Sequence, residues 1–167
     1  YNIASKVQIV VEHYRENVQP LLEGKAKAMV VVSSRQEAVR WQKAIRAYIE
    51  RRDYPLGVLV AFSGEVNDPE SYPDPVTETS KLLSPGLKNR DIREAFAQPE
   101  FHLLLVANKF QTGFDQPLLC GMYVDKKLAG IQAVQTLSRL NRAHPGKDTT
   151  YVLDFVNEAG DVLKAFK

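Results

Sequence analysis

The sequence feature that most constrains the fold is a series of short, continuously apolar segments that alternate with helical patterns. Four of them, at residues 28–32, 57–62, 101–107 and 118–124, are apolar almost throughout instead of alternating with polar residues, and residues 149–155 form a fifth predicted strand. Strands of this kind are buried on both faces, as they are in parallel sheets that helices cover from both sides. The pattern therefore predicts an α/β fold with a parallel sheet in a three-layer α/β/α arrangement.

Apolar residues at helical spacing occupy most of the intervals between these segments. We expect helices over residues 3–18, 35–52, 89–97, 129–143 and 157–166. Pro20 ends the first of them, and the pair Ser33-Ser34 offers an N-cap to the second.

The stretch from Ser63 to Gly86 departs from this alternation. It contains four prolines with Gly, Asp, Asn and Ser between them, so it predicts an irregular loop with one short helical turn near residues 77–83. An insertion of this length in a compact domain is functional or mobile.

Length and composition set broad limits on the function. A chain of 167 residues with 44% apolar and 25% charged residues is typical of one globular domain, here residues 1–167. Its net charge of +2 confines any nucleic-acid site to a local patch. The single cysteine, Cys120, excludes an internal disulfide and a cysteine-cluster zinc site, and the three histidines lack ligand-like spacing. We therefore expect no metal site.

The sequence contains neither a membrane span nor a secretion signal. No apolar run approaches the ~18 residues that a transmembrane helix needs, and no basic N-terminal stretch precedes an apolar one. The chain begins with Tyr1 instead of Met. We expect a piece excised from a larger cytoplasmic protein, with no membrane partner.

Polar segments that follow the apolar runs are candidate ligand sites, because ligands of open parallel sheets bind beyond the carboxyl ends of the strands. Four segments meet this condition: 33–35, 63–64, 108–115 and the start of the helix after Val124. In the third, Gly113 permits close backbone approach, Lys109 carries a charge and Asp115 can accept hydrogen bonds from arginine or ribose. The same segment is compatible with a plain polar turn.

The predicted helix over residues 129–143 has an unusual polar face. At about 100° per residue, Gln132, Gln135, Arg139 and Arg142 fall within an arc of roughly 80°. No carboxylate lies at helical spacing from the two arginines, so they repel one another unless an anion lies between them. Guanidinium groups suit phosphate oxygens, but a solvated cationic face explains the same pattern.

These segments resemble motifs of superfamily 2 helicases. The run from Gln135 to Arg142 is similar to motif VI, residues 101–117 resemble the strand and centre of motif V, and Met29 to Arg35 is similar to motif IV. The amino-acid sequence over residues 107–117, 122–127 and 132–142 closely resembles that of the restriction (R) subunit of type I restriction-modification enzymes. Ser138 stands where many superfamily 2 members have Gly, and it fits the type I group.

The resemblance implies a second RecA-like, Rossmann-like lobe that helps to enclose ATP. In such motors the first lobe brings the phosphate loop and the Mg²⁺-binding acid. The match then makes Arg142 the arginine finger, Arg139 a second phosphate contact and Gln135 a residue that positions the nucleotide. A cation supplied in this way accelerates phosphoryl transfer by ~10³–10⁵-fold. Gly113 and Asp115 would belong to the nucleotide site as well, with Gly113 also near DNA phosphates.

The resemblance also implies contacts with DNA and with other proteins. Tracking along DNA independently of sequence requires contacts to phosphates. The expected partners are double-stranded DNA, the first lobe and nuclease domain of the same chain, and the modification and specificity subunits of the complex. The positions that match DNA-contacting motif residues are Ser33, Ser34, Ser63, Gly64, Lys109 and Thr112.

The chain lacks the motifs that hydrolysis or cleavage requires. The segment 146–148 has a Gly-Lys pair, but Asp148 replaces the Ser or Thr of a phosphate loop. The segment 23–25 contains only the Glu-x-Lys half of a nuclease motif, with no Asp before it. We expect ATP and Mg²⁺ to be held mainly by the first lobe, with none bound to this chain alone, which should neither hydrolyse ATP nor cut DNA.

Two alternatives remain open at this stage. The first is the equivalent lobe of a type III restriction subunit or of another superfamily 2 DNA or RNA helicase. The second is a non-catalytic nucleic-acid or nucleotide-binding module on a Rossmann-like sheet, in which the two arginines are dispensable.

Overall fold

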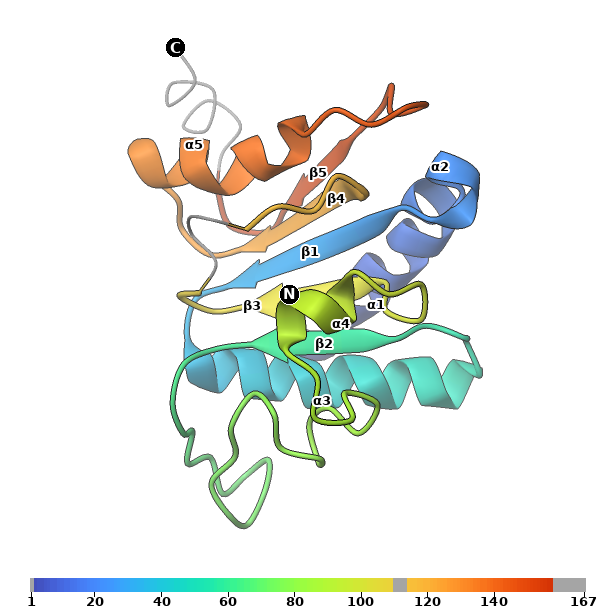
Figure 1. Ribbon diagram of the computed structural model, residues 1–167. Coiled ribbons are helices and arrows are strands. Elements are labelled where there is room, and N and C mark those ends of the chain that lie inside the picture. The colour runs from blue at the N-terminus through green and yellow to red at the C-terminus, as the bar shows by residue number, and fades with distance from the viewer. Residues whose placement is uncertain (1, 110–113, 158–167) are drawn as a thin grey trace.

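The computed structural model describes residues 2–109 and 114–157, and its centre is a five-stranded sheet (Figure 1). All neighbouring strands are parallel, in the order β2-β3-β1-β4-β5. The strands are β1 (Lys27–Val32), β2 (Val58–Ala61), β3 (Leu103–Val106), β4 (Leu119–Asp125) and β5 (Tyr151–Asp154). The predicted parallel α/β sheet is confirmed.

Helices cover both faces of the sheet and make the fold three-layered (Figure 1). One face is covered by α1 (Ile3–His13), its π-helical continuation η1 (Tyr14–Val18) and α3 (Arg35–Arg52). The other face is covered by α4 (Ile92–Phe96), α5 (Ile131–Leu137) and the 3₁₀ turn η2 (Ser138–Asn141). A short helix, α2 (Leu21–Gly24), leads from the first layer into β1.

The two cores explain why the strand sequences are apolar without alternation. In the central strand β1, Val30 and Val32 face the core under α1 and α3, whereas Met29 and Val31 face the core under α4 and α5. Because side chains along a strand point to opposite faces, both sets must be apolar. Cys120 lies in the first core, as expected, and burial raises the pKa of its thiol.

Helix α3 has the bounds that its sequence predicts, because both of its ends are specified locally. The Ser34 hydroxyl accepts a hydrogen bond from the Glu37 amide at 3.1 Å and caps the start of the helix. Asp53 adopts a left-handed conformation with φ of 57° and ends it. On its inner face Trp41 is fully buried, and its indole N–H donates to Asp125 at 3.2 Å.

Several predicted helix bounds are wrong in detail. The helix expected over residues 89–97 is limited to α4, because Lys88 and Asn89 have positive φ and Asp91 caps the helix one turn later. The helical turn expected near residues 77–83 is limited to one isolated turn, in which the Ser84 amide donates to the Ser80 carbonyl at 2.9 Å, and other hydrogen-bonded turns flank it. The helix expected over residues 157–166 lies outside the described residues, apart from Asn157.

The insertion over residues 63–86 is anchored to α3 and to the edge strand β2. Its Asp68 carboxylate is 3% exposed and accepts two hydrogen bonds from Arg40, at 2.9 Å and 3.2 Å. The Gln42 amide of α3 donates to the Val58 and Leu83 carbonyls, so it connects the helix, the outer edge of β2 and the insertion. The insertion is therefore part of the packed domain.

Asp68→Asn is expected to weaken the dependence of stability on acid pH. The Arg40 and Ser71 hydrogen bonds lower the pKa of the Asp68 carboxyl from 3.8 to about 2. Its contribution to stability is therefore complete above its unfolded pKa and is lost as the pH falls from about 4 towards 2. Urea unfolding over this range should show a shallower loss for Asp68→Asn than for the wild type. Glu70→Gln, which removes the 84%-exposed carboxylate on the same arginine, serves as the control and should follow the wild type.

Across residues 2–109 and 114–157, the helices are too short or too polar to cross a lipid bilayer.

Candidate functional site

The carboxyl ends of β1 and β2 are connected by one arginine. Arg35, the first residue of α3, donates from Nη1 to the carbonyl oxygens of Ser63 at 2.9 Å and Glu65 at 3.1 Å. Gly64 has a φ of +75°, and a Cβ built on it would lie 3.1 Å from the same Nη1. The structure therefore holds Ser63 and Gly64 in a fixed turn. Ser33 is exposed, whereas the Ser34 hydroxyl is engaged as the cap of α3.

Lys109, at the carboxyl end of β3, contacts a residue that the sequence analysis missed. Its Nζ lies 2.7 Å from each carboxylate oxygen of Glu78, and Glu78 also accepts a hydrogen bond from the Phe62 amide at 2.9 Å. Glu78 lies in the irregular insertion, where no motif or periodicity distinguishes one acidic residue from another. Only the folded arrangement shows that it reaches a predicted DNA contact.

The remaining residues of the motif V segment divide into two groups. Thr112 and Gly113 lie outside the described residues, so their predicted roles stay predictions. Asp115 is exposed and forms an ion pair with Arg142, with 3.1 Å between Oδ1 and Nε. The structure thus joins two of the predicted nucleotide-site residues, which are 59% and 61% exposed.

The helix predicted over residues 129–143 is shorter than expected. The α-helical part ends at Leu137, a 3₁₀ turn follows to Asn141, and Arg142 is extended with φ of −64° and ψ of 123°. Pro145 explains the end, because a proline ring would clash with the carbonyl of residue 141 in a continuing helix. The Ser138 hydroxyl also donates to the Gln135 carbonyl at 3.1 Å, which competes with the backbone pattern.

As a result, the two arginines do not project side by side from one helical face. The guanidinium of Arg139 turns inward over β1, with Nη1 3.5 Å from the sulfur of Met29. Its Nη2 is buried and has no hydrogen-bond partner in the part of the chain that the structure describes. Burial lowers the pKa of Arg139. The expectation of a shared cationic face is therefore wrong: Arg142 and Gln135 are exposed, and Arg139 is packed against the sheet.

Asp125, at the carboxyl end of β4, is another residue that the sequence analysis did not single out as a site. It is 8% exposed and accepts hydrogen bonds from Lys6 Nζ at 2.8 Å and from Trp41 Nε1 at 3.2 Å. It therefore joins α1 and α3 to the end of β4. An acidic residue directly after a buried strand is the signal that could have identified it.

The histidines have structural partners. His13 Nδ1 lies 2.7 Å from the Tyr123 hydroxyl, and His102 Nδ1 accepts a hydrogen bond from the Gly57 amide at 3.1 Å. Over residues 2–109 and 114–157 no group of three or more His, Cys, Asp or Glu residues is placed to bind a metal ion.

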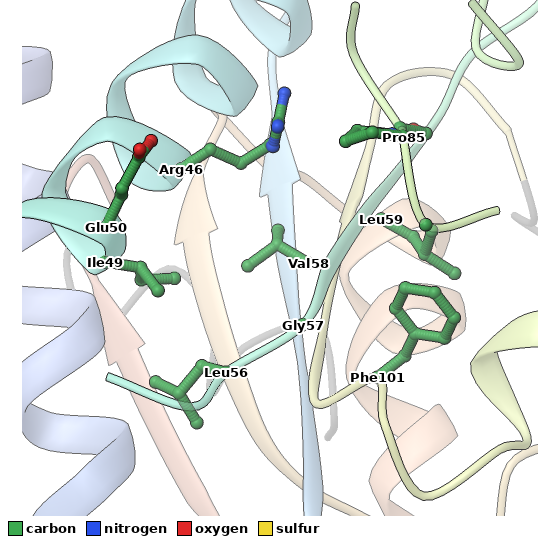
Figure 2. A pocket seen from close by; sticks show the side chains of 11 residues that line it. Arg46, Ile49, Glu50, Leu56, Gly57, Val58, Leu59, Pro85 and Phe101 are labelled. Atoms are coloured by element: carbon green, nitrogen blue, oxygen red, sulfur yellow. The ribbon is translucent and has the colours of Figure 1, made fainter. Parts of the chain in front are cut away.

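One cavity lies apart from these residues (Figure 2). It has a volume of about 230 Å³ and is lined by the second half of α3, the start of β2 and Phe101. In Figure 2 the aliphatic side chains of Ile49 and Leu56 line it with Phe101, next to Gly57. None of the predicted site residues lines it, so it is separate from the candidate site.

Comparison with known proteins identifies the kind of domain. A family model described as type I restriction enzyme subunit R domain 3 matches residues 79–157. The chain is also 30% identical, over 159 residues, to a Methanocaldococcus jannaschii protein named as the MjaIXP endonuclease subunit of a type I restriction enzyme. That match covers 93% of this chain and 14% of that protein, so the chain spans a small part of its relative's length.

Solved structures show the same fold. A fragment of an HsdR subunit of a type I restriction enzyme from Vibrio vulnificus YJ016 is similar with a TM-score of 0.65 and 13% identity, covering 99% of this chain and 28% of that chain. Domain 2 of the Mss116p DEAD-box helicase is similar with a TM-score of 0.50 and 15% identity, covering 92% and 49%. The RecA-like fold and the resemblance inferred from the motifs are thus confirmed. The chain belongs to the family of type I restriction enzyme R subunits and has the RecA-like α/β fold.

Proposed function

We propose that this chain is the second motor lobe of an ATP-dependent DNA translocase in a type I restriction enzyme R subunit, and that it supplies motifs IV, V and VI. The observation that carries the proposal is that the positive charges of the two motif VI arginines are only partly balanced by groups of this chain. Arg142 is 61% exposed beside the Asp115 carboxylate, and Arg139 has a buried Nη2 without a partner among the described residues. A buried cation without a counter-ion is unfavourable, so an anion from outside this chain would stabilise Arg139, and the exposed Arg142 is accessible to the same anion.

The phosphates of ATP have the chemistry that these two residues suit. Guanidinium groups bind phosphate oxygens through paired, charge-assisted hydrogen bonds. Arg142 would bind the phosphates from its exposed position, and Arg139 would join it after its side chain rotates away from Met29. When bound, ATP supplies the free energy of phosphoryl transfer. Asp115 would orient Arg142, Gln135 would position the nucleotide, and Mg²⁺ would be held mainly by the first lobe.

The DNA contacts of the proposal are contacts to the backbone. Ser33 and Ser63 are exposed at the carboxyl ends of β1 and β2, and the Arg35 hydrogen bonds fix the turn that carries Ser63. Hydroxyl and amide donors of this kind bind phosphates and position a protein on DNA without reading its sequence. The specificity and modification subunits would select the site, and the nuclease domain of the same chain would cut.

The 167-residue chain alone is expected to show no ATP hydrolysis and no DNA cleavage, because it contains neither a phosphate loop nor paired carboxylates for Mg²⁺. Magnesium-dependent phosphate release should be measured on this chain and on the R subunit that contains it, with and without duplex DNA. The proposal is supported if the R subunit hydrolyses ATP and the 167-residue chain does not. Hydrolysis by the isolated chain would contradict it.

Gene neighbours distinguish this function from the closest alternative. A type I subunit is encoded beside modification and specificity genes, whereas the corresponding lobe of a type III subunit or another superfamily 2 helicase need not be.

A further inference from the structure

The carboxylate of Glu78 occupies a small anion site at the carboxyl ends of β2 and β3. The ammonium of Lys109 lies 2.7 Å from both carboxylate oxygens, and the Phe62 amide donates to one of them at 2.9 Å. The side chain of Glu78 is 17% exposed and that of Lys109 is 30% exposed, so the contact is partly shielded from water. One ammonium and one backbone N–H therefore converge on a single anion.

The two donors are held by the sheet. Phe62 follows the last residue of β2 and is fully buried, which fixes the direction of its N–H. Lys109 lies three residues after the end of β3, and the two strands pair in parallel up to Ala61 and Val106.

The backbone around Glu78 is held independently of its carboxylate. On one side Val76 pairs with Val66 in an antiparallel bridge, and on the other side Leu83 is buried. The Glu78 carbonyl itself accepts a hydrogen bond from the Ser84 hydroxyl at 3.3 Å. The side chain can therefore leave the two donors by rotation, while the insertion stays folded.

We propose that Glu78 is an internal substitute for a DNA phosphate: a backbone phosphate displaces its carboxylate from Lys109 and from the Phe62 amide when DNA binds. The inference rests on the proposed function and gives the insertion over residues 63–86 a role in it. Glu78 therefore lowers the affinity for DNA, because every phosphate that enters the site must first replace an existing ion pair.

The test is a double-substitution cycle in the R subunit that contains this chain. The probe is a short random-sequence duplex DNA, and the Kd is measured by fluorescence anisotropy at several KCl concentrations. Glu78→Gln should tighten binding by roughly two- to fivefold at low salt, because it removes the competing charge but keeps an oxygen for the Phe62 amide. Lys109→Met should reduce the salt slope by roughly 0.9, as loss of one phosphate contact predicts.

The sign of the coupling between the two substitutions decides between exchange and simple positioning. Under exchange, Lys109→Met weakens binding more in the Glu78→Gln background than in the wild type. If Glu78 only positions Lys109 towards DNA, Glu78→Gln weakens binding and the effect of Lys109→Met becomes smaller, which overturns the proposal. Glu70→Gln removes the same charge from an exposed position of the same insertion and should show no coupling with Lys109→Met.

The outcomes also separate this inference from the proposed function. If the wild-type R subunit shows no salt-dependent binding to the duplex, the proposed DNA contact fails and the exchange falls with it. If the wild type binds but Glu78→Gln leaves the Kd unchanged, or Lys109→Met leaves the salt slope unchanged, only the exchange is overturned.

Discussion

Arg142→Ala in the R subunit that contains this chain is expected to reduce kcat of DNA-stimulated ATP hydrolysis by about 10³-fold or more. The reason is that a guanidinium aimed at the transferred phosphoryl group stabilises charge that develops in the transition state. Arg142 lies outside the helix, is 61% exposed and forms an ion pair with the exposed carboxylate of Asp115. Steady-state phosphate release at saturating DNA gives kcat, and duplex binding is measured separately.

Arg51→Ala is the matched control for this result. Arg51 is also an exposed arginine, but it lies in the last turn of α3, where its guanidinium is 5.6 Å from the centre of the Tyr48 ring. It should leave kcat within about twofold of the wild type, since surface substitutions have small effects. Unchanged hydrolysis in Arg142→Ala would exclude the arginine finger and would favour a non-catalytic nucleotide-binding or nucleic-acid-binding module.

Gly57→Ala is expected to lower the free energy of unfolding by about 3 kcal/mol, through overpacking. A Cβ built on Gly57 would lie 2.1 Å from the Glu100 carbonyl oxygen and 3.0 Å from Cδ1 of Phe101. The backbone cannot easily move away, because the Gly57 carbonyl accepts from the His102 amide at 2.9 Å and the Gly57 amide donates to the His102 ring at 3.1 Å. Urea unfolding of the 167-residue chain measures the change.

Gly86→Ala is the control for this prediction, because Gly86 also lies next to the Phe101 ring. A Cβ there would lie 3.6 Å from Cζ of Phe101, which is an ordinary van der Waals contact. Its free energy of unfolding should stay within about 1 kcal/mol of the wild type. Equal unfolding midpoints for Gly57→Ala and Gly86→Ala would show that the backbone at Gly57 relaxes and that the close approach is not a constraint.

The sequence was most informative where a local rule determines the structure. A strand buried on both faces must be apolar throughout, which is why the position of β1 could be predicted. The bounds of α3 followed from the Ser34 cap and the apolar spacing after it. The motifs added the RecA-like fold, which similar solved structures share.

The site was less predictable, because its geometry depends on contacts between distant residues. The helical projection of Arg139 and Arg142 assumed that one α-helix continues to residue 143, but the α-helix ends at Leu137 and a 3₁₀ turn follows to Asn141. Because residues 138–141 form a 3₁₀ turn, Arg139 faces Met29, which is 110 positions away in the sequence. The contact between Glu78 and Lys109 is equally non-local, and no periodicity encodes it.

The fixed contacts at β2 have a consequence for assembly. The outermost strand of an open sheet normally offers unpaired backbone groups to which another polypeptide can add. In this chain the Gln42 amide binds the Val58 carbonyl and Glu78 binds the Phe62 amide, so backbone groups at both ends of that strand are already engaged. This border of the sheet is therefore less able to accept a strand from another copy of the chain than an edge with free backbone groups at both ends.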